Sequence, residues 1–110
     1  MEVYVVVNKI RSGREALGIF SSQELAQRHM DRRAGKTGYV CATEKSLIRG
    51  SYEPPHHLFA AHTYRGLEDV HVLEGIYAEL SQAQRAAGQE GEIIEFSIDA
   101  SEEIEVFMNE

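Results

Sequence analysis

Apolar and polar residues alternate in short runs along most of the chain, and this pattern predicts strands more often than helices. The first run, residues 3–7, is apolar on both faces, which is typical of a central strand. Ser12-Gly13 follows as a turn signal, so residues 15–20 are predicted to return as the second arm of a hairpin with Leu17 and Ile19 on one face. The predicted strands cover residues 3–7, 15–20, 38–43, 58–64, 69–77 and 92–99.

Helical spacing begins after the second predicted strand. Ser21 and Glu24 match the Ser-x-x-Glu capping box, in which each side chain bonds a free backbone amide of the first turn. A helix is therefore expected to start near residue 22, and Gly35 is expected to end it. Its predicted inward stripe consists of Leu25, Ala26, His29, Met30 and Arg33.

A second helix is predicted at about residues 78–89, with Leu80, Ala83 and Ala87 facing inward. Residues 44–57 contain Pro54-Pro55, which cannot donate backbone hydrogen bonds, so this stretch is interpreted as a connection. Residues 46–52 within it could add a short edge strand. Residues 101–110 are predicted to be either a short strand or an acidic tail.

An eleven-residue phrase occurs twice. Residues 18–28 align with residues 75–85 without a gap, with five identities and an exchange of Phe20 for Tyr77. Each copy lies where an alternating apolar run ends and a helical spacing begins, so a whole strand-strand-helix-strand unit is predicted to be duplicated. The predicted repeats are residues 2–43 and 58–99, joined by residues 44–57.

A chain of 110 residues is long enough for one modest core, so residues 1–110 are predicted to form a single domain. The predicted fold class is α+β, with two ββαβ repeats that share one mixed, mainly antiparallel sheet and carry both helices on one face, in two layers. The alternative is a ferredoxin-like fold, because omitting the first strand of each repeat leaves strand-helix-strand twice.

The motif of Val3-Tyr4-Val5 followed by residues 18–22, Gly-Ile-Phe-Ser-Ser, and an inward Ala26 resembles small uncharacterised domains of bacterial and phage genomes. The likeness extends over about 45 residues of the first repeat. It implies a strand-strand-helix-strand fold and no particular activity.

The net charge of −7 argues against direct binding to nucleic acid, whose phosphates attract Lys and Arg. The charge is unevenly distributed. Residues 1–57 carry nine basic and six acidic side chains, whereas residues 58–110 carry two basic and twelve acidic ones. No apolar run approaches the roughly 18 residues of a membrane helix, and no signal peptide is evident, so a cytoplasmic protein without membrane contact is expected.

Cys41 is the one cysteine of the chain, so no internal disulfide can form. It lies in an apolar run, where a buried small side chain is the usual role. No phosphate-binding loop, dinucleotide fingerprint or nucleophile elbow is present, and no cofactor is predicted.

Four of the five histidines lie between residues 56 and 71. If residues 65–68 form the loop of the second hairpin, His62 falls directly opposite His71, with Cβ atoms about 5 Å apart. Such a pair, with His57 as a further ligand, defines a candidate metal site or the centre of a small enzyme.

Two charged groups complete the candidate sites. The carboxylates from residue 92 onward form a candidate surface for a basic protein partner. That partner could be a nucleic-acid-binding protein, in which case the carboxylates would imitate nucleic-acid phosphates. The residues are Glu92, Glu95, Glu102, Glu103 and Glu105. A basic patch is expected on the first helix, consisting of Arg28, Arg32, Arg33 and Lys36.

The sequence therefore favours a non-catalytic protein-binding or regulatory module, monomeric or homodimeric. The alternative is a small metal-binding or ligand-binding protein or a small enzyme that uses His62 and His71.

Overall fold

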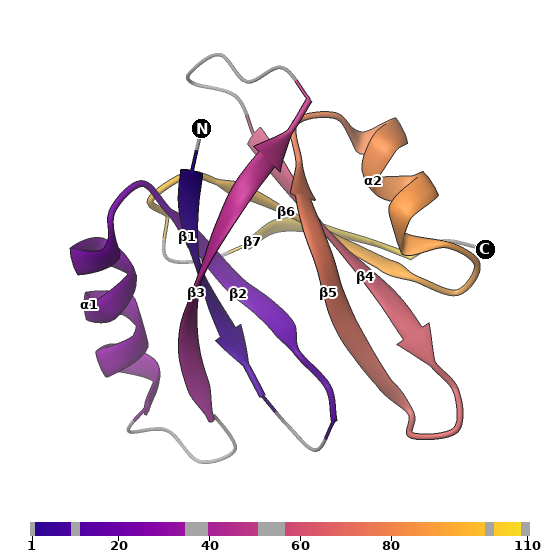
Figure 1. Ribbon diagram of the computed structural model, residues 1–110, viewed down its shortest axis with the longest axis horizontal. Helices are drawn as coiled ribbons and strands as arrows, with labels where there is room; N and C mark the ends of the chain where they lie inside the picture. Colours follow the sequence, from indigo (N-terminus) through magenta and orange to yellow (C-terminus); the bar gives the residue numbers. More distant parts are fainter. Residues whose placement is uncertain (1, 10–11, 35–39, 51–56, 101–102, 109–110) are drawn as a thin grey trace.

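The computed structural model describes residues 2–9, 12–34, 40–50, 57–100 and 103–108. Within them, seven strands form one sheet accompanied by two helices (Figure 1). The first repeat consists of β1 (Glu2–Asn8), β2 (Glu15–Phe20), α1 (Gln23–Ala34) and β3 (Cys41–Arg49). The second consists of β4 (His57–Arg65), β5 (Val70–Tyr77), α2 (Leu80–Ala87) and β6 (Glu92–Ser97), and β7 (Glu103–Met108) follows it. The predicted ββαβ order thus occurs twice.

The strand order in the sheet is β2-β1-β3-β5-β4-β6-β7. In each repeat the first strand lies between its hairpin partner and the strand that follows the helix, and both pairings are antiparallel. β3 and β5 join the repeats by a short parallel pairing at Ile48–Ile76 and Arg49–Tyr77. The sheet is mixed and mainly antiparallel, as predicted. The ferredoxin-like alternative is wrong, because that fold places a strand of the other repeat between β2 and β3, whereas the strand between them is β1 of the same repeat.

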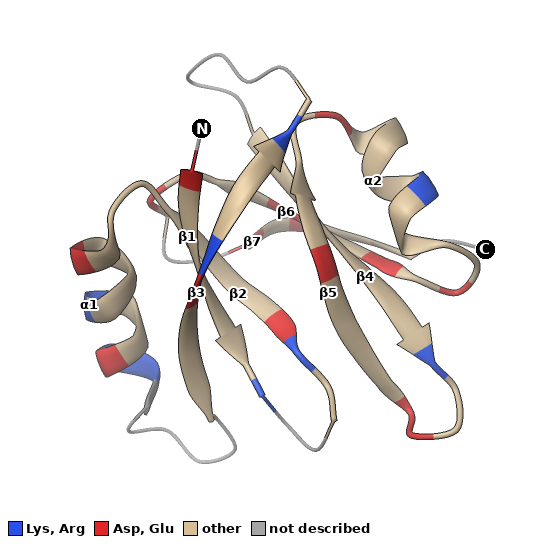
Figure 2. Ribbon diagram, in the orientation of Figure 1, with Lys and Arg blue, Asp and Glu red and all other residues tan. Residues whose placement is uncertain are grey.

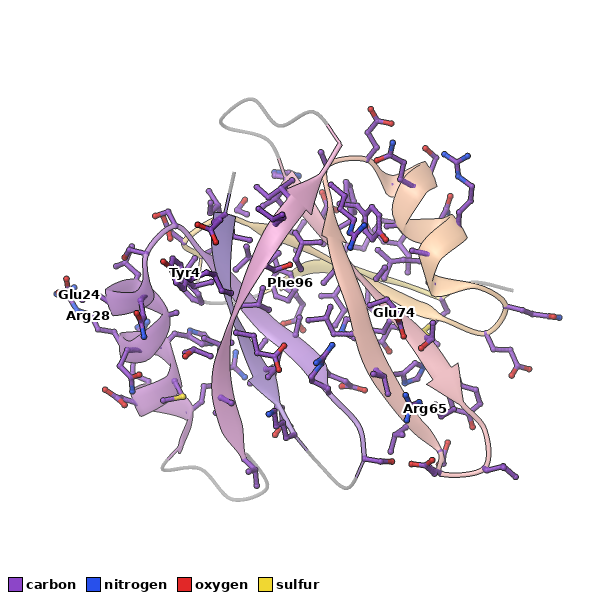
Figure 3. The ribbon with its side chains drawn as sticks, viewed as in Figure 1. Tyr4, Glu24, Arg28, Arg65, Glu74 and Phe96 are labelled. Atoms are coloured by element: carbon purple, nitrogen blue, oxygen red, sulfur yellow. The ribbon has the colours of Figure 1, made fainter. Side chains whose placement is uncertain are left out.

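The sheet curls, so its two faces differ in role (Figure 1). We call the face that carries the largest core the inner face; Phe96 lies at its centre in Figure 3. The buried residues of this core are Val3, Val5, Val7, Ala16, Ile19, Ile48, Leu58, Ala60, Leu73, Ile76, Ile94 and Phe96. Because these residues come from both repeats, the two halves share one interior.

Both helices lie on the opposite face, which we call the helix face. Ala26 of α1 packs with Val6 and Phe20, whereas Ala83 of α2 packs with Ala61 and Ile93. The predicted placement of both helices on one face is confirmed. The expected two-layer arrangement is incomplete, since the curl of the sheet encloses a larger core on the side away from the helices.

Each repeat contains a β-bulge at the same point. β2 has one extra residue at Leu17 and β5 has one at Glu74, immediately before the glycine of the repeated phrase in each case. The extra residue reverses the alternation of side chains. For this reason the expectation that Leu17 and Ile19 share a face is wrong: Leu17 packs on the helix face and Ile19 in the inner core.

The first helix begins one residue later than the capping box implied. The Leu25 amide donates to Ser22 Oγ at 3.2 Å, so Ser22, not Ser21, is the N-cap. The inward stripe is confirmed: Ala26 and His29 are buried, whereas Leu25, Met30 and Arg33 are half-buried. Gly35 lies outside the described residues.

β3 is longer than predicted and does not end at residue 43. Residues 46–49, expected at most as a separate edge strand, continue β3 and supply its pairing with β5 in the middle of the sheet. Pro54 and Pro55 lie outside the described residues. Of the two readings of the C-terminus, the strand is correct for residues 103–108.

α2 is shorter than the predicted range because Glu79, with an extended backbone, precedes it and Gly88, with φ of 70°, follows it. Its predicted inward residues Ala83 and Ala87 are buried. Neither helix of the described chain has the length and apolar character needed to cross a membrane.

Candidate functional site

His62 is completely buried on the inner face, where it connects the two repeats. The Ala16 amide of β2 donates to His62 Nε2 at 3.0 Å, and Nδ1 lies 3.2 Å from the carbonyl oxygen of Glu92 on β6. Because a carbonyl only accepts, the ring proton resides on Nδ1 and the imidazole is neutral. Burial lowers the pKa of His62 from 6.5 to about 4, and nearby Arg14 acts in the same direction.

His71 does not lie opposite His62 as predicted. The hairpin loop consists of residues 66–69 and not 65–68, because Arg65 pairs with Val70, so His62 pairs with Leu73 and His71 pairs with Tyr64. The His71 and Tyr64 rings are 5.1 Å apart between centroids. His71 Nδ1 is 3.5 Å from Glu15 Oε1, and its Nε2 is buried without a hydrogen-bond partner.

His57 lies away from the other two histidines. Its Nδ1 contacts Glu95 Oε2 at 2.5 Å, and alternation along β4 places it on the helix face, whereas His62 is on the inner face. Among the residues that the structure describes, no group of three or more His, Cys, Asp and Glu side chains can hold a metal ion. His57, His62 and His71 are therefore not brought together as one set of ligands.

His29 is the second buried histidine, at 2% exposure on α1. Its ring stacks at a tilt on Phe20, with centroids 5.1 Å apart, and Nε2 accepts a hydrogen bond from Arg33 Nε at 3.2 Å. Burial, with the charges of Arg33 and Arg32, lowers the pKa of His29 to about 4. This histidine is a neutral packing residue of the helix.

The predicted acidic residues are divided between environments. Glu92 is partly buried at the inner face, where burial and the Glu15 carboxylate raise its pKa. Glu95 belongs to the helix face and contacts His57. Glu103 and Glu105 are exposed on β7, and Glu102 lies outside the described residues. Of the predicted acidic residues that the structure describes, the two exposed ones thus both lie on the last strand.

Among the strands that the structure describes, β7 is the last in the sheet order and pairs with β6 alone. Every described position of β7 except Phe107 is exposed. Exposed apolar side chains alternate with the two carboxylates: Ile104 is 47% exposed, Val106 45% and Met108 56%. This combination of a free backbone edge and exposed apolar side chains is uncommon in a strand, because such edges promote pairing with other chains.

One member of the basic patch on α1, Arg28, is neutralised by an ion pair. Arg28 contacts Glu24 at 2.5 Å, and both side chains project into solvent in Figure 3. Arg33 bonds His29, and Lys36 lies outside the described residues. Arg28 and Arg32 border a cavity of about 500 Å³ whose lining also contains two carboxylates and two apolar residues: Phe20, Leu25, Asp31 and Asp99.

A second cavity, of about 460 Å³, lies at the seam between the repeats and is not anticipated by the sequence analysis. We call it the seam cleft; it is lined by Lys9, Ser12, Gly13, Arg14, Arg65, Val72, Leu73 and Glu74. The available signal is the presence of cations at both hairpin turns: Lys9 and Arg14 flank the first turn, and Arg65 begins the second.

Cys41 is half-buried on the helix face, and burial raises the pKa of its thiol. A raised pKa disfavours the thiolate, which is the nucleophilic form. Cys41 is therefore a packing residue, in keeping with the expectation from its apolar surroundings.

Comparison with known proteins identifies no matching family, no similar curated protein and no similar solved structure.

Proposed function

We propose that this protein is a non-catalytic binding module that accepts an extended, basic segment of a partner protein along β7. The observation that supports the proposal is the free edge of β7, where exposed apolar residues alternate with exposed carboxylates. In such a complex, the partner strand would extend the sheet beyond β7.

The backbone of β7 supplies the general attraction. Its hydrogen-bonding groups on the side away from β6 have no neighbouring strand in the described part of the sheet. An added strand would pair them, and its apolar side chains would cover Val106 and Met108, which extend the inner face past Ile94. These contacts provide affinity with little dependence on the partner's sequence.

Charge supplies the selectivity. Glu103 and Glu105 carry the charge of β7, and the whole chain has a net charge of −7, so a segment that contains Lys or Arg is favoured. A second copy of this chain is disfavoured, since two β7 strands would bring carboxylates into proximity. The partner is accordingly expected to be a different, basic protein.

The proposal predicts that a labelled peptide of alternating Lys and Val binds, whereas one of alternating Glu and Val does not. Fluorescence anisotropy would measure the affinity at low and high salt, and amide exchange would locate the contact. Glu105→Lys should weaken binding by about fivefold at low salt, since one exposed charge pair contributes up to about 1 kcal/mol. Added salt should weaken binding to the natural chain.

Glu24→Lys is the matched control, because it makes the same charge change on α1, which takes no part in the pairing of β7. It should leave the affinity for the Lys-Val peptide nearly unchanged. Equal loss in both variants would show that only the net charge matters and would contradict the proposal. Protection of amides anywhere other than residues 103–108, or self-association through β7, would also contradict it.

A further inference from the structure

The seam cleft is formed where two neighbouring strands separate. β3 and β5 pair only at Ile48–Ile76 and Arg49–Tyr77, and towards the other end of β5 they diverge, as Figure 1 shows. The end of β1 and the turn that leads to β2 border the resulting space on one side, and the β4–β5 hairpin borders it on the other. The volume of about 460 Å³ is within the usual range for sites that hold small molecules, roughly 300–1,000 Å³.

Arg14 is held rigidly beside this space. Its amide donates to the carbonyl of His71 at 2.9 Å, and its carbonyl accepts from the Leu73 amide at 2.7 Å, so the backbone is fixed to β5. The guanidinium is fixed as well, because one terminal nitrogen, Nη2, donates to the Leu73 carbonyl at 2.6 Å. Arg14 Nε is buried and has no hydrogen-bond partner.

Lys9 is anchored through its backbone, whose amide donates to the Val40 carbonyl at 2.7 Å. Its ammonium group is 3.9 Å from Glu44, and the same carboxylate is 3.5 Å from Arg14 Nη1. One carboxylate therefore serves two cations. Among the residues that the structure describes, this side of the cleft thus has two cations that share a single carboxylate partner.

Arg65 approaches from the opposite side. It is exposed, and within the described part of the chain it takes part in no hydrogen bond or ion pair. Figure 3 shows its side chain at the β4–β5 hairpin, and Figure 2 shows basic residues on both sides of the seam. An arginine without a carboxylate partner at the mouth of a cleft is available to an anion from solution.

We propose that the seam cleft binds a small phosphate-bearing molecule, with Lys9, Arg14 and Arg65 as its cationic contacts. Guanidinium groups match the geometry of phosphate oxygens, and the fixed Arg14 on one border with the exposed Arg65 on the other favours a ligand that carries more than one anionic oxygen. The site is separate from β7, so it represents a function beyond partner-strand binding.

Glu74 favours a ligand that has a hydrogen-bond donor in addition to its phosphate. It is the bulged residue of β5, it lines the cleft, and its Oε1 already accepts a hydrogen bond from the Thr63 hydroxyl at 2.8 Å. Its remaining lone pairs repel phosphate oxygens but accept hydrogen bonds from a hydroxyl or amino group. A phosphate attached to a hydroxyl-bearing or amine-bearing body would satisfy both sides, whereas a bare polyphosphate would meet some repulsion.

Titration calorimetry with pyrophosphate, inorganic phosphate and citrate tests the site directly. Pyrophosphate is expected to bind saturably at one site per chain and more tightly than inorganic phosphate or citrate. Arg65→Gln should reduce its affinity at least fivefold. Glu74→Gln should increase it by about twofold to fivefold, because it removes a negative charge while it keeps an acceptor for Thr63.

Arg85→Gln on α2 is the matched control, since Arg85 is exposed and its loss changes the net charge as Arg65→Gln does. This variant should bind pyrophosphate like the natural chain. Amide spectra of all variants would verify an unchanged fold. Absence of saturable binding, equal weakening by Arg85→Gln, weaker binding in Glu74→Gln, or citrate binding as tight as pyrophosphate would each overturn the proposal.

Discussion

At the residue scale, His62 shows how a polar side chain fastens the two repeats. The bulges align Val7 of β1 with His62 of β4, so the second repeat has a histidine where the first has an apolar residue. Both ring nitrogens have partners, one in β2 and one in β6. A neutral imidazole suits this position because it donates to the Glu92 carbonyl through Nδ1 and accepts from the Ala16 amide through Nε2. A protonated ring would instead direct a second N–H donor at the Ala16 amide, which is itself a donor.

His62 should therefore make folding sensitive to mild acid. Its pKa of about 4 in the folded chain lies below the ordinary 6.5, so the unfolded chain takes up a proton first as the pH falls. The stability it contributes is complete above about pH 6.5 and is lost progressively towards pH 4; for this group alone the loss between pH 7 and 5 is about 2 kcal/mol. Urea unfolding at both pH values would measure it.

The matched variant is His62→Gln, which retains polar atoms but does not titrate. The difference in stability between pH 7 and pH 5 should be smaller in this variant by about the same 2 kcal/mol. His29 and Glu92 also contribute to the pH dependence of stability: His29 resists protonation as His62 does, and the raised pKa of Glu92 acts in the opposite direction. Both residues are present in the natural chain and in the variant, so their contributions cancel when the two pH dependences are subtracted. An unchanged pH dependence would show that His62 does not remain neutral in the folded protein.

At the element scale, the repeated Gly-Ile-aromatic phrase forms a strand segment that follows a β-bulge and in which the aromatic ring covers the glycine. A Cβ placed on Gly18 would lie 2.8 Å from Phe20 Cε2, and one on Gly75 would lie 3.2 Å from Tyr77 Cε2. The aromatic ring two positions along therefore folds back over the glycine in both repeats. This arrangement explains why the glycine and the aromatic residue recur together.

Gly18→Ala should be more destabilising than Gly75→Ala. The Phe20 ring is 3% exposed and packs against Val6 and Ala26, so it cannot move aside, whereas Tyr77 is only partly buried and can shift. Overpacking of this kind costs about 1–3 kcal/mol, and we expect that range for Gly18→Ala and less than about 1 kcal/mol for Gly75→Ala. Chemical denaturation of the two variants would compare them, and the reverse order would refute the explanation.

The sequence predicted the elements well where one local rule decides. β2 has the predicted bounds, and the stripe of α1 follows from helical spacing. It failed where a single residue changes the register: nothing in composition places the second hairpin loop at residues 66–69 instead of 65–68, and this difference moves the partner of His62 from His71 to Leu73. The seam cleft was also out of reach, because its cations are brought together by the parallel pairing of β3 with β5, a contact without a local signal.

At the scale of the whole molecule, the fold is one interior formed by two similar halves. Val5 of the first repeat and Leu58 of the second belong to the same buried cluster. Contacts outside the sheet pairing reinforce the closure: the Ser21 amide and hydroxyl both donate to the carboxylate of Asp99, at 2.8 and 2.7 Å. Separation of the two repeats would expose the core residues of both. The chain therefore has no boundary at which it could divide into two folded parts.

The protein should accordingly unfold in one cooperative transition, even when only one repeat is weakened. Leu58→Ala should lower the free energy of unfolding by about 2–5 kcal/mol, the usual loss for a buried leucine, and Val5→Ala by a smaller amount because fewer methyl groups are removed. Amide signals from β1 and β6, followed by NMR through a urea titration, should disappear at one common midpoint in each variant. If Leu58→Ala shifted the midpoint of β6 while β1 kept its original value, the halves would be independent domains. Because the core is common to both repeats, a core substitution in either repeat should shift the unfolding midpoint of the whole protein.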